Sequence, residues 1–158
     1  MEKLIWNNDF SVGVQELDEQ HKKIIEIENR LIKAKDVEID SETLSDILSD
    51  LTKYISEHFE SEEKLFYKYN YPDYSSHRAQ HNLFRKQIAK FCIDAMYYKS
   101  TVPIELLTFL EEWWKNHTQG SDMKYKAFFS SISSRIVSVK SYCASSNSLS
   151  KHLINPRQ

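Results

Sequence analysis

The sequence is poor in the residues that interrupt regular structure. It has two glycines and three prolines among 158 residues, which favours long helices with short connections over a turn-rich sheet fold. No stretch approaches the roughly 18 consecutive apolar residues that a membrane span requires, so no membrane insertion is expected. The N-terminus has no basic region followed by an apolar run, so no signal peptide is expected either.

Cysteine and net charge are also scarce. Two cysteines, Cys92 and Cys143, are too few for a disulfide framework, which fits a reducing cytoplasm. The formal net charge of −2 gives no reason to expect nucleic-acid binding. Apolar residues make up 41% of the chain, which is compatible with one globular domain that has a real core. We therefore expect a helical cytoplasmic protein, and we expect it to be a monomer.

Apolar residues recur every three or four positions along four segments, which is the spacing of amphipathic helices. These segments predict an all-α fold, an antiparallel up-down-up-down four-helix bundle with an N-terminal arm and a short C-terminal helix or tail. Asp18 is a candidate N-cap for the first helix, and Gly120 is expected to interrupt the last one. The predicted helices cover about residues 18–35, 41–70, 74–95 and 103–117.

The composition of the chain changes near residue 130. Ten of the last 29 residues are serine, and the four charged residues in that stretch are all basic. We therefore predict a bundle domain at 1–129 and a serine-rich, basic, partly flexible extension at 130–158. The extension could contact an acidic protein partner, but an unstructured terminus explains the same composition.

Five of the six histidines lie on the apolar faces of the predicted helices. A single histidine on such a face is most simply a core residue with a hydrogen-bond partner. Five together are harder to satisfy, because the same faces carry few acceptors. Glu62 follows His58 by one helical turn on the same face, where an ionised carboxylate must be paired or bound to a metal. The five histidines are His21, His58, His77, His81 and His117.

A metal site would satisfy all of these groups at once. With Glu62, and with Asp122 five residues after His117, the candidate ligands number seven, which suits two first-row metals in a bundle core. If both metals are six-coordinate, and both carboxylates and a solvent oxygen bridge them, one coordination position stays open for a small ligand. The nitrogen-rich donor set favours iron, although zinc or manganese would also fit. Glu28 lies near the first apolar stripe, and we place it at the solvent edge.

Four pieces of the sequence occur in the order and spacing of a known protein family. They are Leu17-Asp18-Glu19-Gln20-His21, His58-Phe59-Glu60-Ser61-Glu62, His77-Arg78-Ala79-Gln80-His81, and Asn116-His117 followed by Asp122. One such piece is a weak signal, but all four in order at helix-length separations are a strong one. Over about residues 4–129 the chain therefore resembles the hemerythrins, and most closely the single-domain bacteriohemerythrins.

The resemblance implies a non-haem di-iron site, in which two oxo- or hydroxo-bridged iron ions bind O2 reversibly. His77, His81 and His117 would hold one iron, His21 and His58 would hold the other, and Glu62 and Asp122 would bridge the two. Oxygen would bind to the iron that has only two histidines. A dry pocket would protect the bound oxygen, and its walls would be formed by Ile24, Phe59, Trp113, Trp114 and Thr118.

Two of these pocket positions depart from the family pattern. Members more often have aliphatic residues at the positions of Trp114 and Thr118. Thr118 directly follows the candidate ligand His117. Its hydroxyl either bonds to a carbonyl of its own helix, or it faces the oxygen side, where it would hydrogen-bond the bound oxygen or admit water.

Three classes of function fit these observations. Reversible O2 binding for storage, delivery or sensing is the leading interpretation, because a histidine-rich site with one open position suits binding better than oxygen activation. A di-iron enzyme with peroxidase, nitric-oxide or ferroxidase activity is the second class. A signalling module is the third, and it would act through a partner because the chain has no obvious effector domain. We expect a binding protein and not an enzyme.

Overall fold

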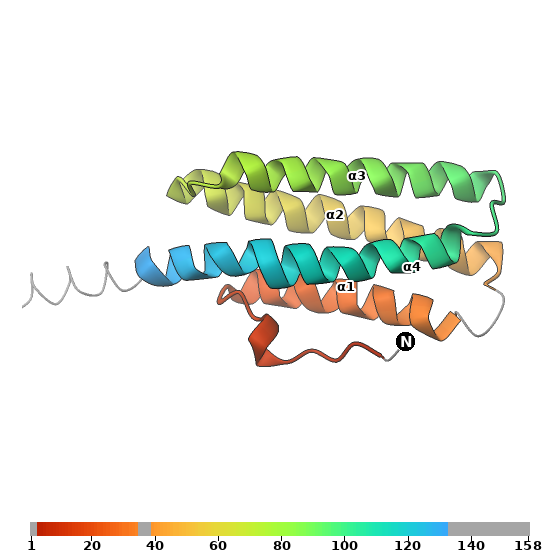
Figure 1. The fold of residues 1–158 in the computed structure, drawn as a ribbon, viewed down its shortest axis with the longest axis horizontal. Coiled ribbons are helices and arrows are strands. Elements are labelled where there is room, and N and C mark those ends of the chain that lie inside the picture. Colours follow the sequence, from red (N-terminus) through yellow and green to blue (C-terminus); the bar gives the residue numbers. More distant parts are fainter. Residues whose placement is uncertain (1–2, 35–38, 133–158) are drawn as a thin grey trace, which may run out of the picture.

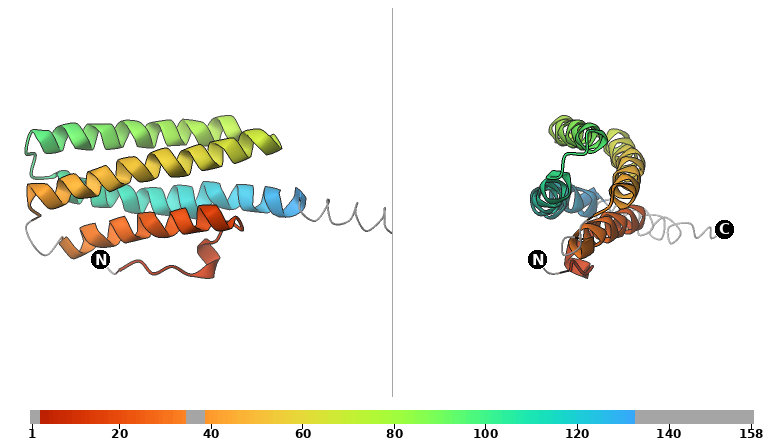
Figure 2. Two further views of the ribbon diagram at one scale, coloured as in Figure 1. Left: turned by 180° about the vertical axis from the view of Figure 1, so that it is seen from behind. Right: turned by 90° about the vertical axis from the view of Figure 1, so that its right-hand side faces the viewer.

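The three-dimensional structure, a computed structural model, describes residues 3–34 and 39–132. Four long helices lie side by side, and each runs antiparallel to the next along the chain (Figures 1 and 2). No strand occurs in these two ranges, so the predicted all-α four-helix bundle is confirmed. The helices are α1 (Gln15–Ala34), α2 (Ser41–Tyr69), α3 (Tyr74–Met96) and α4 (Val102–Trp113).

The last helix of the bundle continues beyond α4. The segment η2 (Trp114–Ser121) is a π-helix, in which backbone hydrogen bonds span five residues, and residues 122–132 are α-helical again. Gly120 lies inside η2 and does not have a positive φ, so the expected interruption is a π-helical turn within a continuing helix and not the end of the helix. A glycine with ordinary helical dihedral angles weakens a helix without ending it. Most of the predicted extension, from residue 133 onward, lies outside the described residues.

The ends of α2 follow from local chemistry. The carboxylate of Asp40 accepts a hydrogen bond of 2.7 Å from the backbone N–H of Thr43, which satisfies one of the free donors at the start of the helix. At the other end Asn70 has a φ of 52°, the left-handed conformation that asparagine tolerates and that commonly ends a helix. Both boundaries agree with the predicted helix at 41–70.

Asp18 has a different role from the predicted one. The helix α1 begins at Gln15, so Asp18 lies within its first turn and is not the N-cap. Its carboxylate instead accepts hydrogen bonds from the Ser11 hydroxyl at 2.6 Å and from the Val12 backbone N–H at 2.7 Å. Gly13, with a φ of 77°, provides the turn that lets the helix start earlier than predicted. Asp18 therefore ties the N-terminal arm to α1.

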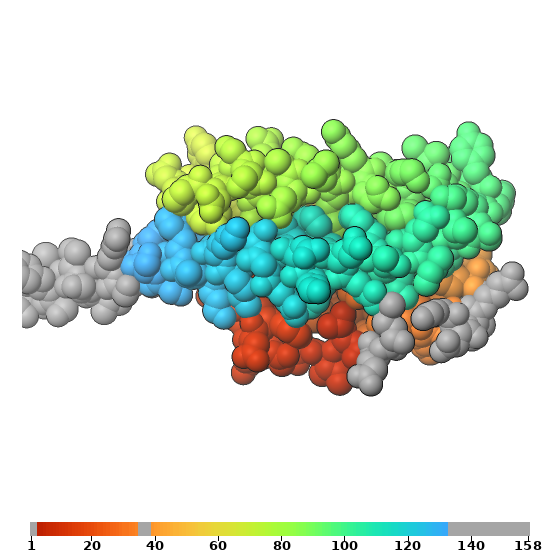
Figure 3. Space-filling view, viewed as in Figure 1, coloured from red at the N-terminus to blue at the C-terminus, as the bar shows by residue number. Residues whose placement is uncertain are grey.

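The N-terminal arm packs along the bundle beside α1 and the α4–η2 helix (Figure 3). Its short helix η1 (Asn8–Phe10) places the Phe10 ring edge-on to Trp114, with 5.2 Å between ring centroids. Further along, the Asn29 side chain exchanges two hydrogen bonds with the backbone of Leu4, at 2.9 and 2.8 Å. Trp6 and Phe10 are partly buried and pack against the core.

The core consists of two apolar clusters at different levels of the bundle. The larger one contains Ile24, Phe59, Phe84 and Trp114, and the smaller one contains Leu17, Phe66, Tyr71 and Tyr125. On each long helix the polar candidate ligands lie between the two clusters. A residue of the larger cluster flanks them on one side, and a residue that belongs to the smaller cluster or packs against it flanks them on the other. Apolar side chains therefore cover the candidate site from both ends, which places it in a desolvated interior.

No helix in the described part of the chain is long and apolar enough to cross a membrane.

Candidate metal centre

The seven predicted ligand residues converge in the interior of the bundle. None is more than 2% exposed. His21 comes from α1, His58 and Glu62 from α2, His77 and His81 from α3, His117 from η2, and Asp122 directly follows η2. Glu62 lies close to candidate ligands from the other three helices, because it is at the level where the two apolar clusters meet. Segments more than 100 residues apart in the sequence, at His21 and Asp122, thus meet at one place.

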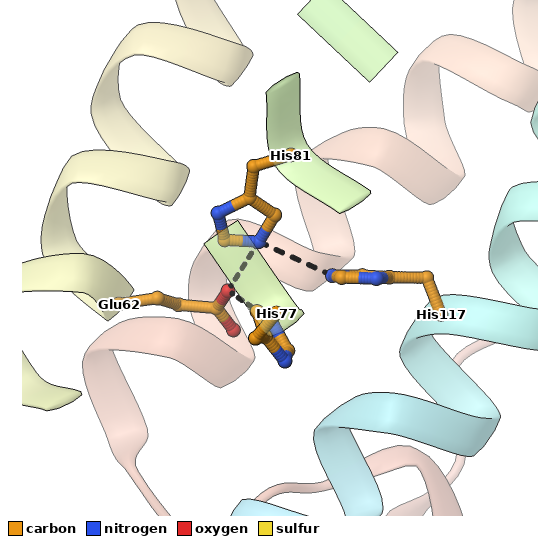
Figure 4. Close-up of side chains that lie close together, drawn as sticks. All are labelled: Glu62, His77, His81 and His117. Carbon is orange, nitrogen blue, oxygen red and sulfur yellow. Dashed lines mark hydrogen bonds and ion pairs between the residues drawn. The ribbon is translucent and has the colours of Figure 1, made fainter. Parts of the chain in front are cut away.

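Three histidines lie close to Glu62, and two of them face one of its oxygens (Figure 4). Glu62 Oε2 lies 3.1 Å from His81 Nε2 and 3.3 Å from His77 Nε2. His117 Nε2 lies 3.2 Å from His81 Nε2, so the imidazoles turn their lone-pair nitrogens toward one another. Two neutral imidazole nitrogens this close to each other without a shared proton repel unless a cation lies between them.

His21 and His58 form a second group, which lies near the other oxygen of Glu62 and one oxygen of Asp122. His58 Nε2 lies 3.6 Å from Glu62 Oε1, and His21 Nε2 lies 3.2 Å from Asp122 Oδ2. The remaining oxygen, Asp122 Oδ1, points back to the first group, at 3.4 Å from His77 and 3.3 Å from His117. Glu62 and Asp122 therefore each present one oxygen to each group of histidines, which is the arrangement that a carboxylate needs in order to bridge two metal ions.

Several of these buried polar atoms have no hydrogen-bond partner among the described residues, so we can ask whether a metal would compensate them. Both ring nitrogens of His21 and both carboxylate oxygens of Asp122 are buried without a hydrogen-bond partner in the described chain. An uncompensated buried carboxylate is very costly, and the contact between Asp122 and His21 does not have hydrogen-bond geometry. Cations among these oxygens and nitrogens would satisfy them all, so the residues fit a two-metal site.

The protonation states agree with this interpretation. Burial lowers the pKa of His58 to about 3 and lowers the pKa values of His21 and His117, so these imidazoles are neutral, the form that binds metals. Burial would raise the pKa of Glu62, but the surrounding histidines outweigh it and hold that pKa well below its ordinary value. Burial and the charge of Glu62 raise the pKa of Asp122. A bound cation would reverse this shift, because it favours the ionised carboxylate.

The π-helical segment η2 explains why a ligand spacing of five residues works. In an α-helix, residues five apart point in directions about 140° apart, because each residue turns the helix by about 100°. Here the backbone N–H of Asp122 donates to the carbonyl of His117, the five-residue hydrogen bond of a π-helix. This bond places the two side chains over the same side of the helix. The spacing of five residues was the available signal in the sequence, and the break expected near Gly120 takes the form of this π-helical turn.

Residues next to the candidate ligands orient three of the imidazoles. Each of these imidazoles donates its Nδ1–H to an oxygen, which leaves Nε2 free to bind a metal. His58 donates to Gln20 Oε1 at 3.0 Å, His117 to Gln80 Oε1 at 2.8 Å, and His81 to Glu63 Oε1 at 3.0 Å. Gln20 and Gln80 adjoin His21 and His81 in sequence but orient a histidine of another segment. The sequence alone indicates no role for any of the three.

Tyr125 orients the candidate bridging carboxylate Glu62, a role that its position in the sequence did not indicate. Its hydroxyl donates a hydrogen bond of 2.7 Å to Glu62 Oε1, and the ring is fully buried in the smaller apolar cluster. Burial and the charges of Glu62 and Asp122 raise the pKa of Tyr125 well above its ordinary value, so the phenol keeps the proton that it donates. The hydroxyl thereby fixes one oxygen of Glu62 without competing for a metal.

Three of the five residues predicted to line an oxygen pocket, Phe59, Trp113 and Trp114, lie against candidate ligands. Phe59 stacks on His81 with 3.8 Å between ring centroids and 3° between planes, and Trp113 stacks on His117 at 3.8 Å and 19°. Trp114 lies edge-on to His21 at 6.3 Å. Ile24 and Thr118 are buried, each 1% exposed. The aromatic rings limit the orientations of the imidazoles, so they hold ligand geometry as well as cover the site.

Glu28 is not at the solvent edge, and this prediction is wrong. The residue is 1% exposed, and both carboxylate oxygens are buried without a hydrogen-bond partner among the described residues. The buried face of α1 is wider than a single stripe, because α2, α4 and the N-terminal arm all pack against it. Burial, and to a smaller extent the nearby Glu111 carboxylate, raise the pKa of Glu28 from 4.5 to about 7.

Comparison with known proteins agrees with this geometry. Residues 12–129 match the model of the hemerythrin HHE cation binding domain. Hemerythrin-like proteins of Naegleria gruberi and Naegleria fowleri are each 39% identical over 121 residues, which cover 77% of this chain and 89% of theirs. A bacteriohemerythrin of Stenotrophomonas maltophilia is 30% identical over 125 residues, covering 79% of this chain and 80% of its own. The matched region contains all seven converging residues, and the chain belongs to the hemerythrin family.

Proposed function

We propose that this protein binds O2 reversibly at a di-iron centre, with His77, His81 and His117 on one ion, His21 and His58 on the other, and Glu62 and Asp122 bridging. The observation that carries the proposal is the unequal division of five imidazoles around two shared carboxylates. Three imidazoles fill one side of the site, and two leave a place for a small ligand on the other. Two iron(II) ions would supply one electron each to the bound oxygen, which is the chemistry that a carrier must reverse.

The protein's part in this chemistry is to fix the ligands and exclude water. Gln20, Gln80 and Glu63 hold three imidazoles in the tautomer that binds metals. Phe59, Trp113 and Trp114 surround the imidazoles with apolar surface. Water next to the bound oxygen would promote release of that oxygen as superoxide or peroxide and leave the oxidised, inactive site. A covered site therefore favours reversible binding over turnover.

A di-iron enzyme is the second candidate function. Within the described chain, the site has two bridging carboxylates and five imidazoles, a donor set that leaves the metals less electron-rich than a carboxylate-dominated set would. This difference favours binding over oxygen activation. The observation for the enzyme is the buried Glu28, an ionisable group one turn beyond the pocket residue Ile24 on α1.

Visible spectroscopy under alternating gases separates the two functions. Iron(II)-loaded protein is exposed to O2 and then to vacuum over several cycles, with the iron content measured before and after. A carrier gives a colour that appears with O2 and disappears under vacuum in every cycle. Loss of the colour after one cycle, with peroxide released and O2 consumed repeatedly once a reductant is added, would mean that the protein is an enzyme.

Thr118 is expected to accelerate autoxidation, the slow loss of electrons from the oxygen-loaded site. A hydroxyl on the oxygen side would hydrogen-bond the bound oxygen or admit water, so Thr118→Ile should autoxidise more slowly. One hydrogen bond of about 1 kcal/mol corresponds to about a fivefold change in rate. The measurement is the decay of the oxygen-dependent colour in air.

Thr118→Val is the matched control, because valine removes the hydroxyl and keeps the shape of threonine. Slower autoxidation in both variants assigns the effect to the hydroxyl, and slower autoxidation in Thr118→Ile alone assigns it to side-chain volume. Equal rates in all three proteins would mean that the hydroxyl is turned away from the oxygen.

A further inference from the structure

The histidines of the site differ in what their outer nitrogens bond to. His58 and His117 each donate Nδ1–H to the neutral amide oxygen of a glutamine, Gln20 and Gln80. His81 donates its Nδ1–H to a carboxylate, Glu63 Oε1, at 3.0 Å. Among the outer hydrogen bonds of the described histidines, this is the one that ends on a charge. The charge lies on the side of the site that has three imidazoles.

Glu63 is held in place from outside the site. Arg85 donates to the same oxygen, Oε1, at 3.0 Å, and Arg78 Nε lies 3.3 Å from Oε2. The Arg85 guanidinium also lies 5.1 Å from the centroid of the Phe59 ring, the ring that stacks on His81. With its side chain 15% exposed, Glu63 stands between the buried imidazole and the two arginines on α3.

We infer that Glu63 is a positioning residue that strengthens His81 as a donor and thereby sets the affinity and redox behaviour of the three-histidine metal. The inference rests on the proposed metal centre. A carboxylate that accepts Nδ1–H draws the proton toward itself and increases electron density at Nε2, more than an amide oxygen does. The two arginines reduce the field of Glu63 at a distance, but the direct hydrogen bond remains and its geometry becomes more rigid.

The simpler alternative is that Glu63 only links α2 to α3. Its ion pairs with Arg78 and Arg85 connect the two helices near the surface, and exposed ion pairs of this kind contribute little to stability. A purely structural Glu63 would leave metal affinity unchanged when its charge is removed. A positioning Glu63 would lower the affinity for one metal, so metal binding separates the two roles.

The test uses Glu63→Gln, which keeps the shape and the acceptor oxygen and removes the charge. Binding of cobalt(II) is titrated anaerobically by its visible absorption, and unfolding of the metal-free protein is followed in urea. We expect the affinity for one of two cobalt ions to fall roughly 10- to 100-fold, with little change in the unfolding midpoint. In the iron-loaded protein the reduction potential should rise. Glu60→Gln, an exposed carboxylate on the same helix, is the control and should change none of these.

A compensating variant makes the test stricter. Gln80→Glu places a carboxylate on His117, which belongs to the same three-histidine group as His81. The double variant Glu63→Gln/Gln80→Glu should recover most of the lost cobalt affinity if donor strength is the cause, but it cannot restore a link between α2 and α3. Unchanged affinity in Glu63→Gln, or no recovery in the double variant, would overturn the inference.

The outcome is separable from that of the proposed function. If the parent protein binds two cobalt ions but its iron form does not bind O2 reversibly, the carrier proposal fails and the role of Glu63 is still decided by the cobalt titration. If the parent binds no cobalt, both fail.

Discussion

Loading the metal-free protein with two divalent ions is expected to raise its thermal unfolding temperature by roughly 15–30 °C. At a free metal concentration about 1,000 times the dissociation constant, each ion adds about 4 kcal/mol of stability, and each kcal/mol raises the unfolding temperature of a chain this size by about 2–4 °C. The physical source is the buried site itself, where Asp122 and His21 have no hydrogen-bond partner among the described residues and a bound cation would compensate them. Calorimetry with iron(II) under argon, and with zinc as a redox-inert ion, measures the shift.

Asp122→Asn is the informative variant for this prediction. Burial already disfavours the ionised carboxylate, so replacing it with a neutral amide should change the unfolding temperature of the metal-free protein little. The same change removes a bridging ligand and should remove at least half of the rise that metal causes. The site would not be a metal centre if the parent's unfolding temperature did not respond to either ion, or if Asp122→Asn responded as fully as the parent.

Glu28→Gln is expected to have a higher free energy of unfolding than the parent above pH 7. The difference between the two proteins should be up to about 3 kcal/mol larger there than at pH 4. The pKa of Glu28 is raised by burial from 4.5 to about 7, and each unit of difference corresponds to about 1.4 kcal/mol. The folded state holds the proton more tightly than the unfolded state. Ionisation therefore destabilises the folded protein increasingly as the pH rises from 4.5 to 7. Glutamine cannot ionise, so the variant avoids this loss.

Urea unfolding of the parent and Glu28→Gln over this pH range measures the effect. The candidate ligands titrate identically in both proteins, so the difference between them isolates Glu28, and any fixed cost of burying the amide appears equally at every pH. Glu26→Gln, on the exposed face of the same helix, is the matched control and should show no such trend. A difference that stays constant from pH 4 to pH 8 would mean that Glu28 has a partner or solvent access in the folded protein.

Much of the fold was predictable because helix formation depends on local pattern. The stripes of α2 and α3, the Asp40 cap and the end of α2 at Asn70 all follow from residues within a few positions of one another. The start of α1 was predicted too late, because Asp18 has the chemistry of an N-cap but bonds to Ser11 and Val12 of the arm. That choice depends on where the arm lies, which no local pattern specifies.

The candidate site was predictable to a similar extent. Histidines and carboxylates on apolar faces need compensation wherever those faces meet, so His58 and Glu62 already indicated a metal. The burial of Glu28 was missed, because the stripe on α1 gives the direction of a side chain but not how many neighbours cover it. The pairing of Gln20 with His58 and of Gln80 with His117 was missed because both pairs join different segments.

By itself the sequence determined the helices, the face of each that turns inward and the ligand types on those faces, because rotation per residue is a property of the backbone alone. Only the tertiary structure decided which carboxylate oxygen faces which histidine, which side chains orient the imidazoles and how the π-helical turn brings Asp122 beneath His117. These depend on the register between helices, which is set by packing over the whole interior and not by any one segment.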